Sequence, residues 1–304
     1  MARARFDALD GVLLLDKPTG ISSNVALQRA RRLLQADKAG HTGTLDPLAC
    51  GLMALTFGEA TKFSADLLDA DKSYEAGVAL GVTTSTADAE GEVLQTLAVA
   101  VSRGQFEAAL PALTGRIEQV PPMHSALKRN GQPLYALARR GVQVERLPRV
   151  VQVHRLWVIS WDEARPTIGV DCGKGLYVRT LAEDLGRALG CGAHLGALRR
   201  TRVGRFDLSE AIGLEGLEAL TLQARRARVL PVDALLQQLP RVDLDGEACR
   251  QLGHGRSVAC AMASVPRARV YGPHGHLLGV ATVDHGILTA RRLINQARVL
   301  ESQR

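Results

Sequence analysis

The sequence predicts an α+β fold in two parts, a large body of strands and helices followed by a small β module. Apolar runs typical of strands recur over residues 11–238, and segments with helical spacing of apolar residues lie between them. After Pro240 the pattern changes to short alternating apolar runs broken by glycine. A chain of 304 residues is long enough for one large core and a small second domain. We therefore expect domains over 1–239 and 240–304.

The elements of the first part can be predicted in chain order. Residues 11–17 form an expected buried strand, which a Pro-Gly turn and a serine N-cap join to a helix over 24–35. Residues 120–150 are rich in proline and basic side chains, which is typical of an exposed lobe. The other predictions are strands at 52–58, 73–82, 150–161 and 167–172, a polar loop at 83–93, helices at 59–72 and from the cap Ser102 to about Leu113, a strand end running into a helix at 176–190, and helical segments around 214–238.

Composition excludes several classes of protein. No run approaches the ~20 apolar residues of a membrane span, and the basic start has no apolar segment typical of a signal peptide, so we expect a cytoplasmic protein. The five cysteines form no CxxC pair or Cys/His cluster, which argues against a structural zinc site and a disulfide framework. The net charge of +7 is compatible with a nucleic-acid partner but is weak evidence alone.

The familiar catalytic and cofactor motifs are missing from the sequence. It contains no GxxxxGK[ST] phosphate loop, no HExxH and no GxSxG. His274 and His276 form an HGH pair on an expected turn, where a solvated tip is a more common outcome than a metal ligand. The sequence therefore predicts no cofactor and no metal.

Residues 40–51, GHTGTLDPLACG, hold a single acid, Asp46, in a loop rich in glycine and threonine. Aspartate before proline is a common turn former, so Asp46 either caps a turn or acts alone in chemistry. Taken singly, Tyr74 and Tyr177 at strand positions are typical core aromatics, and Arg179 is a typical surface arginine. The residues alone leave these alternatives open.

A set of segments found in this order resembles one family. The matching segments are DKPTGISS, KAGHTGTLDPLACG, GEATKF, DKSYEA, PPMHSALK, GKGLYVRTLAEDLG and HLGALRRTRVG. Together they resemble the TruB family, the bacterial tRNA pseudouridine-55 synthases, over residues ~11 to 238. The six lysines fall within these segments or beside their signature residues, at positions 17, 38, 62, 72, 128 and 174. The last ~60 residues resemble, more weakly, the PUA or PUA-like RNA-binding domain that ends these enzymes.

The resemblance implies a fold, a reaction and a partner. The fold would be the pseudouridine synthase fold, a mixed, largely antiparallel sheet flanked by helices, with a small C-terminal PUA-type domain like a β-barrel. The reaction would isomerise one uridine in the T-loop of tRNA after base flipping, with no redox carrier and no metal. The expected partner is the T-arm of tRNA, with no membrane and no small-molecule cofactor, and the expected state is a monomer.

The resemblance also assigns roles to the residues of the catalytic set. Asp46 matches the catalytic aspartate, Arg179 the arginine that pairs with it, and Tyr74 the tyrosine that stacks on the target base. Burial would raise the pKa of Asp46, and a neighbouring cation would oppose that change. We expect Tyr177 and Arg179 to share one face of a strand, since two residues apart on a helix they would point to opposite sides.

The remaining assignments concern substrate binding. His41 would fill the space that the flipped base leaves, Tyr177 and Leu198 would line the pocket, and Lys17 would belong to a supporting turn near the site. Lys128 is assigned to substrate contact as well. Position 124 is His where the family pattern leads us to expect Tyr, which affects the expected contacts of the lobe only.

Three alternatives remain at this stage. The RNA-guided ribosomal pseudouridine synthases share the aspartate loop and a terminal PUA domain, although the long lobe at 120–150 favours a stand-alone enzyme. A second alternative is a tRNA-binding or tRNA-folding protein with incidental catalysis. A small-molecule glycosidase would need two carboxylates at the sugar, and the sequence offers no convincing second acid. Whether Asp46 attacks C1′ or C6, or abstracts a proton, cannot be decided from sequence.

Overall fold

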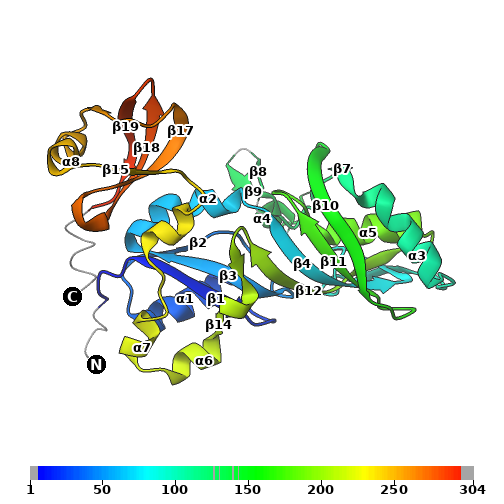
Figure 1. Ribbon diagram of the computed structural model, residues 1–304. Coiled ribbons are helices and arrows are strands. Elements are labelled where there is room, and N and C mark those ends of the chain that lie inside the picture. Colours follow the sequence, from blue (N-terminus) through cyan, green and yellow to red (C-terminus); the bar gives the residue numbers. More distant parts are fainter. Residues whose placement is uncertain (1–5, 126, 130, 139, 143, 296–304) are drawn as a thin grey trace.

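Most of the described chain is organised around one large sheet, with a smaller sheet at the C-terminal end (Figure 1). The computed structural model describes residues 6–125, 127–129, 131–138, 140–142 and 144–295. Within these residues, ten strands form the large sheet and five form the small one. None of the helices in the described ranges is both long and apolar enough to span a membrane. The predicted α+β class is confirmed.

The large sheet is mixed and largely antiparallel, as expected. Its main path runs, in order, through β14 (Ile212–Gly213), β1 (Gly11–Lys17), β3 (Cys50–Phe57), β12 (Ala193–Val203), β4 (Lys72–Leu80), β11 (Thr167–Cys172), β10 (Arg149–Ser160) and β7 (Gly115–Gln119). Two short strands join it from the side, β2 (Ala39–His41) on β3 and β13 (Phe206–Asp207) on β12. The β1–β14 and β3–β12 pairs are parallel, and the other pairs are antiparallel.

Helices cover the sheet and short segments connect its strands. The α-helices of the body are α1 (Ser23–Leu34), α2 (Ser64–Leu68), α3 (Arg103–Ala109), α4 (Leu134–Ala138), α5 (Val178–Ala188), α6 (Leu214–Ala219) and α7 (Leu222–Arg226). Short 3₁₀ segments lie at Gly58–Phe63, Leu110–Leu113, Leu208–Glu210 and Val232–Leu236. Two small hairpins are formed by β5 (Val82–Thr84) with β6 (Val93–Thr96), and by β8 (Lys128–Arg129) with β9 (Gln132–Pro133). The predicted serine caps are confirmed at α1 by Ser22 and at α3 by Ser102.

Strands β1 and β3 are buried on both faces, which explains their continuous apolar sequences, VLLL and LMAL. One face, including Leu13 and Leu55, packs against Ala26 and Ala30 of α1 and against α6. The opposite face, including Leu14, packs against the Val232–Leu236 segment and residues of the small C-terminal sheet.

The other half of the sheet has one principal core face. Alternate residues of β4 and β11 point toward α3 and α5, among them Ala76, Val78, Ile168 and Val170. Leu181 and its neighbours on α5 cover this face in return. Tyr74 is the residue of β4 that continues this row toward the aspartate loop.

The C-terminal residues form a five-stranded sheet with one helix. The strand order is β15 (Arg241–Asp243), β17 (Val265–Tyr271), β18 (Leu277–Asp284), β19 (Ile287–Leu293) and β16 (Val258–Ala259), with α8 (Gly246–Gly253) beside it. Figure 1 shows this sheet in orange and red, next to α2 at one end of the body. Val280 and Ile294 enter the same apolar cluster as Leu14 and Phe63 of the body. The small sheet therefore packs against the large one through a shared core.

Two predicted elements outside the candidate site differ in type from the structure. The single helix expected over 59–72 is instead a 3₁₀ segment followed by the short α2. The Thr61 hydroxyl donates to the Gly58 carbonyl and the Ser64 hydroxyl to the Thr61 carbonyl, and such bonds compete with regular helical pairing. The polar segment at 83–93, expected to be only a loop, starts and ends in the strands of the β5–β6 hairpin.

Candidate active site

The aspartate loop connects β2 to β3 and is fixed by its own backbone. The Ser23 hydroxyl donates to the Leu45 carbonyl and accepts from the Leu45 amide, both at 2.8 Å. The Gly20 amide donates to the Pro47 carbonyl at 2.8 Å, and the Ala49 amide to the Asp46 carbonyl at 3.1 Å. Asp46 therefore takes part in a turn through its backbone, which leaves its side chain available for another contact.

That contact is an ion pair with Arg179. Oδ2 of Asp46 lies 3.0 Å from Nη2 of Arg179, and the two side chains are 42% and 7% exposed. Burial raises the pKa of the Asp46 carboxyl above its ordinary value, and the guanidinium opposes that rise. The structure thus joins the two residues at a carboxylate that is still open to solvent on one side.

Arg179 also contacts a second acid that the sequence reasoning missed. Its Nη1 lies 3.4 Å from Oδ2 of Asp88, whose side chain is only 3% exposed. The Thr86 hydroxyl and the Glu90 amide both donate to Oδ1 of Asp88, at 2.5 and 3.1 Å. Arg179 donates further to the carbonyls of Thr86 and His124. The expectation of an isolated carboxylate is wrong, but the second one is bound to the arginine and buried.

Asp88 could not be recognised because it lies in the polar segment between β5 and β6. The hairpin and a single bridge between Asp88 and Leu195 place it against the N-terminus of α5. Nothing in the sequence TTSTADAEGEV distinguishes this aspartate from the acids beside it. Its negative charge adds to the rise in the Asp46 pKa.

Arg179 lies in a helix, so the strand predicted for residues 177–179 is wrong. Tyr177 is the N-cap of α5, with extended backbone, and the helix begins at Val178. The reason is the helical spacing of Val178, Leu181 and Leu185, which are buried in one apolar cluster. A cation in the first turn opposes the helix dipole, and the two carboxylates offset that cost.

Tyr177 is held beside this turn by its backbone. Its amide donates to Oε1 of Gln119 at 3.1 Å, and its carbonyl accepts from Nε2 of the same side chain at 3.4 Å. The ring is half-buried, and burial raises the pKa of its phenol. The charge of Arg179 opposes this rise and that of Asp46 adds to it, as expected for a residue two positions from Arg179.

Tyr74 and Leu198 lie on neighbouring strands below the aspartate loop. Tyr74 on β4 is 9% exposed and stands opposite Val170 and Arg200 in the strand register. Burial raises the pKa of its phenol, and Arg200 opposes that rise. Leu198 on β12 stands opposite Ala76 and packs, half-buried, against the same apolar cluster as Tyr74. Both residues therefore pack in the apolar cluster that also contains Leu45 and Ala49, on either side of Asp46 in the sequence.

Lys17 is a supporting residue, and the assignment of substrate contact does not suit its position. Its side chain is fully buried, and Nζ donates to the carbonyls of Pro18 and Ile21 at 2.8 and 2.7 Å. An ammonium bound in this way holds the turn after β1 and is not accessible to RNA. Burial lowers the pKa of Lys17, and Asp46 is among the groups that oppose this.

His41 and Lys128, also predicted at the site, are placed differently. His41 ends β2 and is half-buried, and burial followed by the charge of Arg200 lowers the pKa of its imidazole. Its Nδ1 is buried and has no hydrogen-bond partner within the described residues. Lys128 lies in β8, and its side chain is outside the described part of the structure.

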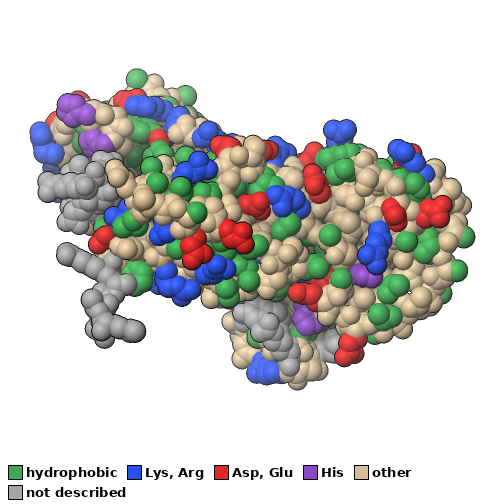
Figure 2. Space-filling view, turned by 90° about the horizontal axis from the view of Figure 1, so that it is seen from below, with side chains coloured by type: hydrophobic (Ala, Val, Ile, Leu, Met, Phe, Trp, Pro, Cys, Tyr) green, Lys and Arg blue, Asp and Glu red, His purple; other side chains and the backbone are tan. Residues whose placement is uncertain are grey.

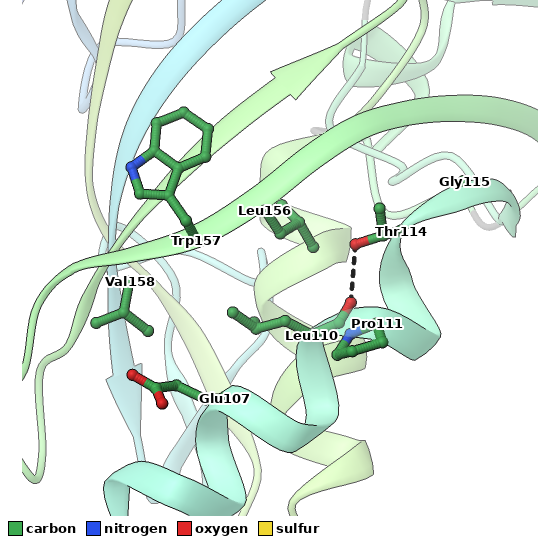
Figure 3. Close-up of a pocket in the computed structure, with 8 residues that line it drawn as sticks. All are labelled: Glu107, Leu110, Pro111, Thr114, Gly115, Leu156, Trp157 and Val158. Carbon is green, nitrogen blue, oxygen red and sulfur yellow. Dashed lines mark hydrogen bonds between the residues drawn. The ribbon is translucent and has the colours of Figure 1, made fainter.

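A surface cavity of about 690 Å³ lies away from these residues. Figure 3 shows it between α3 with its 3₁₀ extension and strand β10, with the Thr114 hydroxyl donating to the Leu110 carbonyl on its wall. Leu110, Leu156 and Val158 are among the apolar residues that line it. None of the predicted site residues lines it, so cavity size does not identify the site in this molecule.

Comparison with known proteins decides the family. Residues 31–178 match the model of the TruB family pseudouridylate synthase N-terminal domain. Residues 179–237 match the tRNA pseudouridylate synthase B C-terminal domain, and 240–294 match the C-terminal region of pseudouridine synthase II TruB. A relative named tRNA pseudouridine synthase B, from Dechloromonas aromatica (strain RCB), is 54% identical over 290 residues, which cover 95% of this chain and 97% of the relative. The chain belongs to the TruB family.

Other comparisons extend this result. The tRNA pseudouridine synthase B of Ralstonia nicotianae is 57% identical over 295 residues, covering 94% of both chains. A solved Cbf5-Nop10-Gar1 complex contains a chain with TM-score 0.71 and 24% identity, covering 95% of this chain and 85% of that one. A structure of an H/ACA RNP bound to a substrate RNA has a chain with TM-score 0.69 and 21% identity, covering 95% and 86%. At these identities the likeness shows a shared fold, and the predicted pseudouridine synthase fold is confirmed.

Proposed function

We propose that this TruB-family enzyme converts the T-loop uridine of tRNA, position 55, to pseudouridine, with Asp46 as its catalytic carboxylate. As a member of the TruB family the chain is an isomerase that acts on tRNA uridine. The observation that supports the role of Asp46 is its partly exposed carboxylate, held 3.0 Å from a buried guanidinium. In such a pair the guanidinium favours the ionised form of an acid that remains partly exposed to solvent.

The chemistry fits one active carboxylate. The reaction breaks the N1–C1′ bond and forms a C5–C1′ bond, while the proton leaves C5 and N1 becomes protonated, so no atom is gained or lost. Because the detached base attacks the sugar again, no second acid has to activate water. Asp88 is bound to Arg179, Thr86 and the Glu90 amide, which suits a role in holding Arg179. Attack by Asp46 on C1′ or C6 and abstraction of a proton are all compatible with this placement.

The target uridine has to leave its stack to reach Asp46. Base flipping costs about a few kcal/mol, and contacts made only by the flipped base have to offset it. Tyr74 offers a flat ring next to the aspartate loop, and stacking of a base on an aromatic ring contributes about 1–3 kcal/mol. We assign to His41 the filling of the vacated position. Burial and the charge of Arg200 lower the pKa of its imidazole, which favours the neutral ring.

Phosphate contacts are assigned to several parts of the surface. In the view of Figure 2, basic side chains are interspersed with acidic ones and form no single continuous patch. The charge of +7 therefore supports contacts through separate basic regions, among which we place the lobe at 120–150 and the C-terminal sheet. Such contacts make RNA binding weaken as salt concentration rises.

The experiment that tests this function compares wild type with Asp46→Asn on an unmodified tRNA transcript labelled with tritium at uridine C5. Wild type alone should release tritium from the T-loop uridine. Asp46→Asn should lose up to about 10⁴-fold in rate, the upper end of what one acid–base group contributes, and should still bind tRNA. Asp162→Asn, an exposed acid in the turn between β10 and β11, is the matched control and should be fully active.

Two outcomes would overturn the proposal. Appreciable turnover by Asp46→Asn would remove Asp46 from the mechanism. A wild-type protein that is inactive alone, but active once a guide RNA and partner proteins are added, would instead place this chain with the RNA-guided enzymes.

A further inference from the structure

Arg200 is a buried arginine next to the site that has no role in the function as described so far. It lies on β12 in the middle of the large sheet, opposite Gly51 of β3 on one side and Tyr74 of β4 on the other. Gly51 has a φ of +100°, and a Cβ at that position would lie 2.3 Å from the Arg200 carbonyl oxygen. Only glycine therefore allows β12 to approach β3 so closely just after the aspartate loop.

The guanidinium of Arg200 connects three parts of the site. Nε donates to the Leu52 carbonyl at 2.7 Å and Nη2 to the Gly43 carbonyl at 3.3 Å. The same group interacts with the Tyr74 phenol on the adjacent strand. Arg200 is 2% exposed, and no ion pair with a carboxylate is found for it in the described ranges.

We propose that Arg200 is a positioning residue of the isomerisation, which fixes the Gly43 turn of the aspartate loop to β3 and holds the Tyr74 ring on β4. This inference rests on the proposed function of Asp46 and Tyr74. Gly43 is three residues before Asp46, and Leu52 is six residues after it, so one side chain spans the base of the loop. The carboxylate and the ring then keep a constant separation while the uridine binds between them.

The charge of Arg200 has a second effect, because it faces several titratable groups. It helps to lower the pKa of His41 and of Lys72, and more weakly that of Lys17, and it opposes the rise in the pKa of Tyr74. Burial and the charge of Arg200 therefore act in the same direction on His41 and favour its neutral ring. Geometry and charge can therefore be separated by different substitutions of the same residue.

The test uses two variants. Arg200→Met removes both the charge and the planar set of guanidinium donors, whereas Arg200→Lys keeps a charge but cannot reach both carbonyls at once. Single-turnover rates on tRNA should fall by about 10²-fold in Arg200→Met, the order expected from a misplacement of about 1 Å, with tRNA affinity nearly unchanged. Arg200→Lys should remain slow by more than about 10-fold. In NMR titration the His41 pKa should rise in Arg200→Met and stay low in Arg200→Lys.

Arg225→Met is the matched control. Arg225 donates to the carbonyls of Leu33 in α1 and of Leu217 and Glu218 in α6, so its loss costs similar hydrogen bonds away from the site. This variant should lower the unfolding temperature without changing the rate or the His41 titration. If Arg200→Met fails to fold, Arg200→Lys alone decides the positioning role by its rate at saturating tRNA.

The outcomes separate this inference from the function on which it rests. If wild type is active and Arg200→Met is equally active, only the positioning role is overturned. Where Arg200→Met does not fold, an Arg200→Lys variant as active as wild type has the same consequence. Wild type that leaves the T-loop uridine unchanged would overturn the proposed function, and the Arg200 role with it, unless another uridine is converted. In that case the same variants are measured on that uridine.

Discussion

The site contains two buried arginines in opposite electrostatic surroundings. Arg179, at the N-terminus of α5, contacts the carboxylates of Asp46 and Asp88. Arg200, on β12, donates to the carbonyls of Leu52 and Gly43 and faces the phenol of Tyr74. Buried charges normally need a charged partner or several hydrogen bonds, and each arginine uses a different one of these solutions. Arg179 therefore sets the charge of the site, whereas Arg200 sets its geometry.

The difference determines what each substitution should do to the protein. Removing Arg179 leaves Asp88 buried without its cation, and breaking a buried pair in this way costs about 3–5 kcal/mol. Removing Arg200 leaves carbonyl acceptors and a phenol without a partner. These groups are neutral, so the loss in the free energy of unfolding should be smaller than for Arg179.

The largest effect is expected for Arg179→Met. It should lower the free energy of unfolding by about 3–5 kcal/mol and turnover by more than about 10³-fold, since both carboxylates lose their partner. Urea unfolding measures the first quantity and tritium release at saturating tRNA the second. Binding of tRNA should change little, because the guanidinium is buried.

The double variant Arg179→Met with Asp88→Asn is the control for this prediction. It removes the buried negative charge of residue 88 that the loss of Arg179 leaves unpaired. The free energy of unfolding should therefore recover most of the loss, while turnover stays low. Recovery of both quantities would contradict a role for Arg179 in the reaction. A large loss of tRNA affinity with normal turnover would instead make Arg179 an RNA contact.

A second prediction concerns pH. Asp46 has to be ionised, and its pKa is raised above 3.8 by burial, so activity should fall as pH decreases through that raised pKa. Arg179→Gln should move this acidic limb to higher pH, because the cation that lowers the Asp46 pKa is lost. Asp88→Asn should move it to lower pH, because a like charge is lost.

The measurement is a single-turnover pH–rate profile for wild type and both variants. Electrostatics predicts that the acidic limb moves in opposite directions in the two variants. A general loss of structure would not produce opposite shifts. If both variants shift the limb in the same direction, the proposed assignment of the limb to Asp46 is wrong.

The fold could be predicted largely because its signals are local. The strand at Thr167–Cys172 has the predicted bounds, and the serine caps of α1 and α3 were recognised from residue types at fixed spacing. The family-specific segments located Asp46 and Arg179, and they prove to be in contact. These features depend on residues close in sequence or on motifs that can be recognised from the order of residue types alone.

Asp88 and Arg200 could not be predicted because their roles depend on contacts between distant segments. Asp88 reaches Arg179 across 91 positions through a hairpin whose sequence is that of an ordinary polar loop. Arg200 differs from Arg199 beside it only by its side of the strand, and alternation alone does not say which side faces the site. The helical start at Val178 was missed for a related reason, since two residues are too few to separate a strand end from a helix.

The smallest effect is expected at the contact between the body and the C-terminal sheet. At Arg200 a cation has neutral hydrogen-bond partners, whereas at this contact the charged group is an anion. There an anion, Asp233, has a neutral partner, since the Tyr271 hydroxyl donates to its Oδ2 at 2.6 Å. Burial and this carboxylate raise the pKa of Tyr271 to about 12, so the phenol stays protonated over the working pH range.

Tyr271→Phe should lower the free energy of unfolding by about 1–2 kcal/mol, the value of one hydrogen bond to a charged group, and leave turnover at saturating tRNA unchanged. Asp233→Asn keeps an acceptor and should cost less, which makes it the matched control in the same urea titration. Because Val280 and Ile294 share a core with the body, the contact retains most of its energy without the hydroxyl. A change in turnover in Tyr271→Phe would mean that the C-terminal sheet acts on the site itself, and geometry at Asp46 would then depend on more than Arg200.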